Sequence, residues 1–256
     1  MLLVYDVGNT NIVVGLWNDS RLVGRWRFST HPHGTADELR FDARNALDDA
    51  DASPAEIDGV CVACVVPALR RPLEAALRNL TDAPLLWIDA GTSPMRLDVS
   101  EPWAVGADRI VDCVAAYAQY GGPLLVIDFG TAATFNLVSR EGNFLGGAIA
   151  PEMAVAGEAL VSRAAQLFSV RLDPPATVVG KTTAANLEAG IVLGHLDLVD
   201  GLIRRFRAEA DAGLRVVATG GKGELYARHL DAIEVYDPDL TLVGLRLCWE
   251  GARRKR

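Results

Sequence analysis

Two short stretches of the sequence place an aspartate directly after an apolar run and a glycine two residues later. They are LLVYDVGNTNI, residues 2–12, and LLVIDFGTAAT, residues 124–134. Glycine permits the tight or positive-φ turn that such a strand end needs. The hydroxyl and amide side chains that follow, with exposed backbone N–H groups, form a cradle suited to phosphate oxygens. A carboxylate at the strand end would face a ligand crevice, where it would hold a metal ion that bridges phosphates.

A simpler interpretation is that each aspartate only caps a hairpin turn, as Asp, Asn and Gly often do. One copy alone would favour that interpretation. Two copies, each at the start of one half of the chain, favour internal duplication and two turns that bind one phosphate chain. A third glycine turn, AlaThrGlyGlyLysGly (218–223), is weaker evidence because it lacks the spacing of a P-loop.

The elements expected around these turns alternate between strands and helices, which is typical of an α/β protein. Each half begins with a meander of three strands, near 2–28 and near 124–149. Thr35 and Glu38 have the spacing of a capping box, so a helix is predicted to begin there. Further strands are predicted at 59–66, 85–88, 214–218 and 233–236, and further helices after Pro67, from near Ala104 to Gly121, and at 152–167, 182–209, 223–230 and 240–250.

Composition narrows the class of protein. The chain has 256 residues, half of them hydrophobic, and a net charge of −8, which argues against a nucleic-acid partner. No apolar stretch reaches the ~18 residues of a membrane span, and the N-terminus lacks the features of a signal peptide. Cys61 and Cys64 form a CxxC, but in a predicted strand they face opposite sides and would not share a metal. These features predict a cytoplasmic protein with no membrane partner.

The chain resembles the type III pantothenate kinases, a family within the actin, Hsp70 and sugar-kinase superfamily. The resemblance covers nearly the whole sequence and implies two duplicated ribonuclease H-like domains, 1–118 and 119–256, with mixed sheets, flanking helices and ATP bound between them. The motifs that carry it are AspValGlyAsnThrAsn (6–11), ThrAlaAspGlu (35–38), ValValPro (65–67), ValGlyAlaAspArg (105–109), AspPheGlyThrAla (128–132), GlyGlyAlaIleAlaPro (146–151), ThrGlyGly (219–221) and AspProAspLeuThrLeu (237–242).

By that resemblance, Asp108 accepts the proton of the pantothenate hydroxyl. Gly106 and Ala107 present backbone to the substrate, and Arg109 helps to fix pantothenate or charged oxygens. Simpler interpretations are that Asp108 is an ordinary acid at a helix N-terminus, where the dipole favours its charge, and that Arg109 makes a surface salt bridge. Thr183 matches a threonine that binds pantothenate, although Thr183 or Thr182 would equally serve as a helix N-cap.

The resemblance also implies the remaining ligands. Asp128 is expected to bind the monovalent cation that the family uses, K⁺ or NH₄⁺, while Mg²⁺ accompanies ATP and is held with Asp6. Members of the family are homodimers; Gly190 and Gly194 offer a stripe of small residues for close helix contact, which internal packing would explain as well. The residues expected to contact ATP are Asp6, Val7, Gly8, Asn9, Thr10, Asn11, Ile12, Val13 and Thr131.

Four positions depart from the family pattern. Asn136 stands in place of an acid, Glu152 in place of a glycine, and Val99 where many members carry tyrosine. Asp112 stands where asparagine is common, four residues after Asp108. On a helix this spacing brings two carboxylates together, which predicts a raised pKa for Asp108.

The expected activity is ATP-dependent phosphorylation of pantothenate to 4′-phosphopantothenate, the first step of coenzyme A biosynthesis. One alternative is a catalytically weakened homologue that acts as a nucleotide-binding regulatory module, which Asn136 and Glu152 motivate. Another is a related sugar kinase or polyphosphate-type phosphatase, which would share the Asp-x-Gly turns but not the GlyAlaAspArg set. His31 and His33 are interpreted as part of a polar loop rather than as a metal pair.

Overall fold

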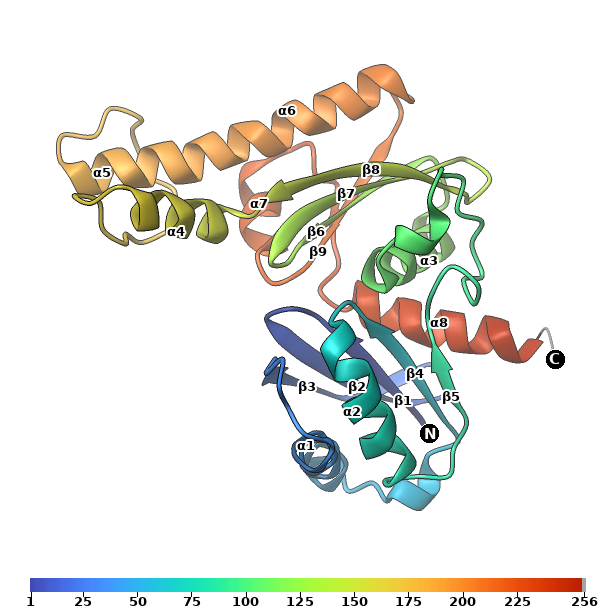
Figure 1. The fold of residues 1–256 in the computed structure, drawn as a ribbon. Helices are drawn as coiled ribbons and strands as arrows, with labels where there is room; N and C mark the ends of the chain where they lie inside the picture. Colours follow the sequence, from blue (N-terminus) through green and yellow to red (C-terminus); the bar gives the residue numbers. More distant parts are fainter. Residues whose placement is uncertain (255–256) are drawn as a thin grey trace. The chain divides into compact units, whose positions relative to one another are not determined.

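A computed structural model describes residues 1–254, which form two compact units (Figure 1). Unit 1 contains residues 1–120, 142–144 and those from 239 onward, and unit 2 contains residues 121–141 and 145–238. The ranges 1–118 and 119–256 stay a prediction about where the duplicated halves meet in the sequence. In the structure the last helix, α8 (Leu240–Arg254), packs in unit 1.

Unit 1 is built on a five-stranded mixed sheet in the order β3-β2-β1-β4-β5. The first three strands form an antiparallel meander, and β4 and β5 are added in parallel beside β1. The five strands match the predicted meander near 2–28 and the predicted strands at 59–66 and 85–88 to within two residues at the outer ends. Their bounds are β1 (Leu2–Val7), β2 (Asn11–Asn18), β3 (Arg21–Ser29), β4 (Gly59–Cys64) and β5 (Leu85–Trp87).

Helices cover both faces of this sheet. Helices α1 (Ala36–Asp49) and α2 (Pro67–Arg78) pack on the face that carries Leu3, Tyr5 and Val7 of β1. Helices α3 (Ala107–Tyr120) and α8 pack on the opposite face, with Leu2 and Val4. Since side chains alternate along a strand, Asp6 projects from the face that α3 and α8 cover.

Local signals explain where two of these helices begin and end. Both hydrogen bonds of the predicted capping box are present, because the hydroxyl of Thr35 accepts from the N–H of Glu38 and the Glu38 carboxylate accepts from the N–H of Thr35. Helix α3 ends at Tyr120, where Gly121 adopts a positive φ of 71°. The prediction for the CxxC is also confirmed: Cys61 packs with α3 and α8, and Cys64 lies against the core under α1 and α2.

Unit 2 repeats the sheet of unit 1. Its strands have the order β8-β7-β6-β9-β10, with β6 and β7 antiparallel and β9 parallel to both β6 and β10. The two sheets therefore share strand order and the mixture of directions, which confirms the duplicated architecture. The bounds are β6 (Leu124–Phe129), β7 (Ala132–Val138), β8 (Phe144–Pro151), of which Phe144 belongs to unit 1, β9 (Arg215–Thr219) and β10 (Val235–Tyr236).

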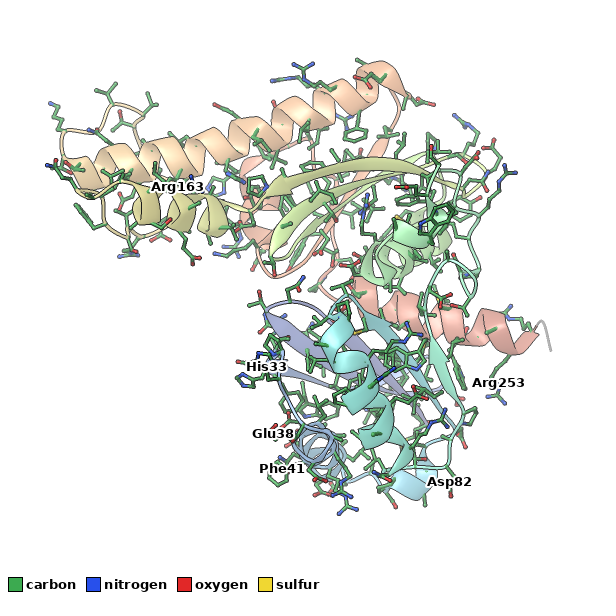
Figure 2. All side chains as sticks on the ribbon, in the orientation of Figure 1. His33, Glu38, Phe41, Asp82, Arg163 and Arg253 are labelled. Atoms are coloured by element: carbon green, nitrogen blue, oxygen red, sulfur yellow. The ribbon has the colours of Figure 1, made fainter. Side chains whose placement is uncertain are left out.

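The helices of unit 2 differ from the predictions in two details. The helix predicted at 152–167 is α4 (Met153–Arg163) and ends earlier, at Arg163, which Figure 2 labels. The segment predicted at 182–209 consists of α5 (Thr183–Glu188), a π-helical turn η3 (Ala189–Leu193) and α6 (Gly194–Glu209). Helix α7 (Gly223–His229) follows β9, as predicted, and none of the helices in residues 1–254 is long and apolar enough to cross a membrane.

Candidate active site

The first candidate turn joins β1 to β2 and is held by backbone and hydroxyl hydrogen bonds. The N–H of Gly8 donates to the carbonyl of Asn11 (3.0 Å), and the hydroxyl of Thr30 donates to the carbonyl of Gly8 (2.7 Å). The N–H of Thr30 also donates to the carbonyl of Thr10 (2.9 Å), so the residue directly after β3 fixes the turn from the side. Asn9 and Thr10 are exposed on it. The turn is therefore a braced loop whose tip is open to a ligand.

The eight residues of this turn that are predicted to contact ATP differ in how far they are exposed to a ligand. The side chains of Val7 and Ile12 are buried in the core beneath α1 and α2, so only their backbone atoms would reach a nucleotide. Asp6, Gly8, Asn11 and Val13 are half-buried. The backbone and the polar side chains of residues 8–11 are thus the part of the set that a phosphate would meet.

Asp108 lies in the first turn of α3, and its carboxylate folds back over the start of the helix. Oδ1 accepts a hydrogen bond from the N–H of Arg109 (2.8 Å). A Cβ at position 106 would overlap this oxygen, so any larger residue there would displace the carboxylate from its present position. The motif GlyAlaAspArg therefore has a steric explanation: Gly106 makes room for the carboxylate of Asp108.

The start of α3 lies beside the carboxyl ends of β1 and β4. Val65 provides the link, because its N–H donates to the carbonyl of Val7 (3.0 Å) and its Cγ1 would be 3.6 Å from a Cβ on Gly106. Asp6 lies in the same region: burial raises the pKa of the Cys64 thiol, and the negative charge of Asp6 raises it further. Within unit 1, the structure thus brings the Asp6 turn and the Asp108 motif to the same edge of the sheet.

Burial raises the pKa of the Asp108 carboxyl above its ordinary value, and the N–H and guanidinium of Arg109 offset part of that rise. The direction agrees with the prediction, but the cause is different. Asp112 is buried, and its Oδ1 accepts a hydrogen bond from the hydroxyl of Thr241 on α8 (2.7 Å). The pKa of Asp108 is raised by loss of solvent rather than by the neighbouring carboxylate, and a carboxylate with a raised pKa is a better proton acceptor.

Arg109 is packed against the protein instead of extending into solvent. Its guanidinium lies over the ring of Phe144, 5.3 Å from the centroid. Burial lowers the pKa of the guanidinium, which stays charged because arginine begins from a pKa above 12. A half-buried, ring-stacked cation beside Asp108 is suited to bind an anionic or carbonyl group of a substrate.

The second candidate turn, in unit 2, holds Asp128 at the carboxyl end of β6. Asp128 pairs in register with Thr219 at the end of β9. The next residue, Gly220, has a φ of 85°, and a Cβ there would overlap Oδ1 of Asp128. A Cβ on Gly130 would lie 3.2 Å from Oδ2. Two glycines therefore flank the two oxygens of one carboxylate. The sequence had indicated Gly220 only as part of the weaker third glycine turn, and its contact with Asp128 was not predicted.

The two threonines predicted in unit 2 are both exposed. Thr131 follows Gly130 in the β6–β7 turn. Thr183 is the first residue of α5, and the N-cap is Thr182, whose hydroxyl accepts from the N–H of Ala185 (3.2 Å). The N-cap alternative is thus assigned to Thr182, and the hydroxyl of Thr183 is not the capping group.

The candidate metal ligands of the chain suit an ion that takes its other ligands from a bound nucleotide. Within residues 1–254, no group of three or more His, Cys, Asp or Glu side chains could hold a metal ion. His31 and His33 are exposed on the loop before α1, where Figure 2 labels His33. Mg²⁺ is usually bound by one or two carboxylates together with substrate phosphates, and Asp6 on the braced turn fits that arrangement.

Comparison with known proteins identifies the family. A family model described as Type III pantothenate kinase matches residues 2–205. Proteins named Type III pantothenate kinase from Roseiflexus sp. (strain RS-1) and Desulfatibacillum aliphaticivorans are 42% and 44% identical to the chain, over 98% of this chain and 98% of each relative. The chain belongs to the type III pantothenate kinase family.

Solved structures place this type III pantothenate kinase family member in a wider fold group. A Baf family protein from Campylobacter jejuni is 20% identical and superposes with a TM-score of 0.62, covering 98% of this chain and 99% of that one. The ethanolamine utilization protein EutJ from Carboxydothermus hydrogenoformans is 15% identical, with a TM-score of 0.54 over 96% of this chain and 88% of that one. At these identities the likeness concerns the fold, and it agrees with the two repeated sheets.

Two of the positions expected to depart from the family pattern, Asn136 and Glu152, are buried in unit 2. Asn136 on β7 is fully buried, and its Nδ2 donates to the hydroxyl of Thr134 (3.2 Å). Glu152 is the N-cap of α4, with a side chain whose Oε2 accepts from the N–H of Ala154 (2.9 Å). Both side chains therefore have hydrogen-bond partners in the fold, as buried polar groups require.

Proposed function

We propose that the chain catalyses the ATP-dependent phosphorylation of pantothenate to 4′-phosphopantothenate, the first step of coenzyme A biosynthesis. The observation that carries this proposal is the placement of Asp108, in a chain of the type III pantothenate kinase family. Its carboxylate lies over Gly106 at the edge of the sheet that also holds the Asp6 turn, and burial raises its pKa. An enzyme of this pathway would act in the cytoplasm.

In the proposed mechanism, Asp108 accepts the proton of the pantothenate hydroxyl and aims its oxygen at the γ-phosphate of ATP. Phosphoryl transfer depends mostly on positioning and charge neutralisation, so a carboxylate of moderate basicity is sufficient. Arg109, the backbone of Gly106 and Ala107, and the hydroxyl of Thr183 would bind the rest of pantothenate.

The N–H groups and polar side chains of residues 9–11 and the hydroxyl of Thr131 would bind the phosphates of ATP. Asp6 would hold Mg²⁺, which neutralises charge on the phosphates when it is bound. Asp6 would need no further carboxylate for this task, because one or two carboxylates together with substrate phosphates and water are the usual ligands of Mg²⁺.

The proposal is tested by coupling ADP release to pantothenate. We expect ADP release that depends on pantothenate and a product phosphorylated at the 4′-hydroxyl, identified by mass spectrometry. Absence of turnover with every cation tried would favour the regulatory module, and turnover only with a sugar would favour a related sugar kinase.

Asp128 is proposed to bind the monovalent cation, K⁺ or NH₄⁺. Cutting its side chain back in Asp128→Ala removes the charge that Gly130 and Gly220 flank. We expect the K⁺ concentration for half-maximal activity to rise about tenfold or more, since a factor of ten corresponds to ~1.4 kcal/mol of lost binding. The measurement is a titration of pantothenate-dependent ADP release with K⁺ at constant ionic strength.

The control for this titration is Asp82→Ala, an exposed acid between α2 and β5 that Figure 2 labels. Its K⁺ curve should match that of the wild type. If Asp128→Ala and the wild type gave identical K⁺ curves, the proposed cation role of Asp128 would be wrong.

The chain is further proposed to act as a homodimer through α4 and the η3 turn. Among residues 1–254, ten large hydrophobic side chains are strongly exposed, and seven of them lie between residues 145 and 179 of unit 2, including Val155 and Leu160 of α4. Helix α4 packs beside η3, where a Cβ on Gly157 would lie 3.4 Å from Ile191. Gly190 of η3 is exposed, and a Cβ there would meet no atom within 4 Å. An apolar surface with a glycine beside it suits a second copy of the chain.

Gly190→Leu tests this interface. The monomer has room for the side chain, so we expect folding to be kept while a partner helix can no longer approach, giving a shift from dimer to monomer. The measurement is sedimentation velocity at micromolar protein. Gly201→Leu on α6 is the matched control, since only Arg204 lies near its Cβ (3.8 Å). A dimer that survives Gly190→Leu would contradict this interface.

A further inference from the structure

A buried glutamate occupies the junction between β8 and α4. Glu152 is 2% exposed, and both of its carboxylate oxygens accept hydrogen bonds. Oε2 accepts from the N–H of Ala154 (2.9 Å), and Oε1 accepts from the hydroxyl of Tyr226 on α7 (3.2 Å). Ser, Thr, Asp and Asn are the usual N-caps, and they are too short to reach both groups. The longer glutamate thus joins the start of α4 to α7.

Tyr226 connects this junction to the Asp128 turn. Its side chain is fully buried, and its ring stacks on the ring of Phe129, with centroids 3.9 Å apart and planes 10° apart. Phe129 is the residue between Asp128 and Gly130. Burial, and then the negative charge of Glu152, raise the pKa of the Tyr226 phenol, so it remains a hydrogen-bond donor. A continuous series of buried contacts therefore leads from Glu152 through Tyr226 to Phe129.

The N-terminus of α7 is fixed to the same turn. The N–H of Lys222 donates to the carbonyl of Phe129 (3.3 Å), and the N–H of Gly223 donates to the carbonyl of Gly220 (3.1 Å). Gly220 itself packs directly on Asp128. Because Phe129 contacts both the N-cap residue Lys222 and the ring of Tyr226, a shift of α7 would displace the backbone that carries Asp128.

We propose that Glu152 is a positioning residue that holds the Asp128–Thr131 turn in place through Tyr226 and Phe129. It thereby sets the affinity for ATP and for the monovalent cation. This inference rests on the proposed function, in which that turn contacts both. The residue does not touch the reacting atoms; its effect passes through the stacked rings and α7.

Tyr226→Phe is the most direct test because it removes only the hydroxyl and keeps the ring stack. We expect KM for ATP and the half-activating K⁺ concentration each to rise about tenfold, as for loss of a hydrogen bond to a charged group. KM for pantothenate should change less than about threefold, because its proposed ligands lie mainly in unit 1. Glu152→Gln, which keeps an acceptor oxygen and the side-chain length, should stay within about threefold of the wild type in all three values.

A double-mutant cycle separates positioning from general loss of stability. Glu152→Ala and Tyr226→Phe should each raise KM for ATP, and the double variant should be no worse than the more impaired single variant, since both break the same contact. His195→Gln is the matched control: His195 Nε2 bonds the carbonyl of Pro151 (2.7 Å) at the same junction, but from α6. It should lower Tm and leave KM for ATP and the K⁺ response unchanged.

The outcomes distinguish this inference from the proposed function. A wild-type protein without pantothenate-dependent ADP release would mean that the proposed function fails. An active wild type would overturn the positioning role alone if Tyr226→Phe lowered Tm without changing KM for ATP or the K⁺ response. The same conclusion would follow if His195→Gln changed these values as much as Tyr226→Phe does.

Discussion

Asp108→Asn should lower kcat by about 10²- to 10⁴-fold, the usual loss when a general base or its positioning carboxylate is removed. Asparagine keeps the shape of the side chain over Gly106, and its oxygen still accepts from the N–H of Arg109. The loss would therefore reflect the missing proton acceptor rather than a rearranged helix. The measurement is steady-state ADP release with saturating ATP and pantothenate, and KM for ATP should stay within about threefold of the wild type.

The same substitution should make the protein more stable at pH 7. Burial raises the pKa of Asp108 in the folded state above its unfolded value of about 3.9. The folded state therefore binds the proton more tightly, and stability falls as pH rises from the unfolded pKa through the folded pKa. Asparagine carries no charge. The gain in the free energy of unfolding of Asp108→Asn over the wild type should therefore be complete at pH 7 and should vanish below pH ~4.

Urea unfolding of the wild type and Asp108→Asn at several pH values measures this difference. For the same reason, the pH profile of kcat/KM in the wild type should fall on its acid side with a midpoint above the ordinary pKa of an aspartate. An unchanged kcat would remove Asp108 from the mechanism. A variant that is less stable than the wild type at pH 7 would contradict a buried, destabilising carboxylate.

The sequence was sufficient for features that depend on short stretches of chain. The capping box at Thr35 and Glu38, the end of α3 at Gly121 and the two Asp-x-Gly turns depend on residues close in sequence. Alternation along the predicted strand also placed Cys61 and Cys64 on opposite faces. Local geometry determines all of these features. The sequence could therefore predict the duplicated fold and the residues of the Asp6 turn that are proposed to bind ATP.

Contacts between distant residues were not open to prediction in the same way. Glu152 and Tyr226 are 74 positions apart, and neither residue type indicates the other. The hydrogen bond from Thr241 to Asp112 joins residues 129 positions apart. Without it, the spacing of Asp108 and Asp112 pointed to repulsion between carboxylates, whereas burial is the cause of the raised pKa. Tertiary packing decided the electrostatics of the candidate site in this case.

Gly244→Ala should destabilise the protein by about 3 kcal/mol or more, at the upper end of the cost of overpacking a core. Helices α3 and α8 approach so closely at this point that a Cβ on Gly244 would overlap the carbonyl oxygen of Val111. The obstacle is backbone, which cannot rotate away as a side chain would. The two helices must separate, and the measurement is the free energy of unfolding in urea.

The same change should reduce kcat in the protein that remains folded, because α3 also carries Asp108, one turn before Val111. Gly251→Ala on α8 is the matched control: its Cβ would make an ordinary contact, 3.7 Å from Cβ of Pro94. The control should be neutral or more stable by up to ~1 kcal/mol, since alanine is the better helix former. If Gly244→Ala unfolded at the same urea concentration as Gly251→Ala, close packing of α8 would not be what holds α3, and with it Asp108, against the sheet.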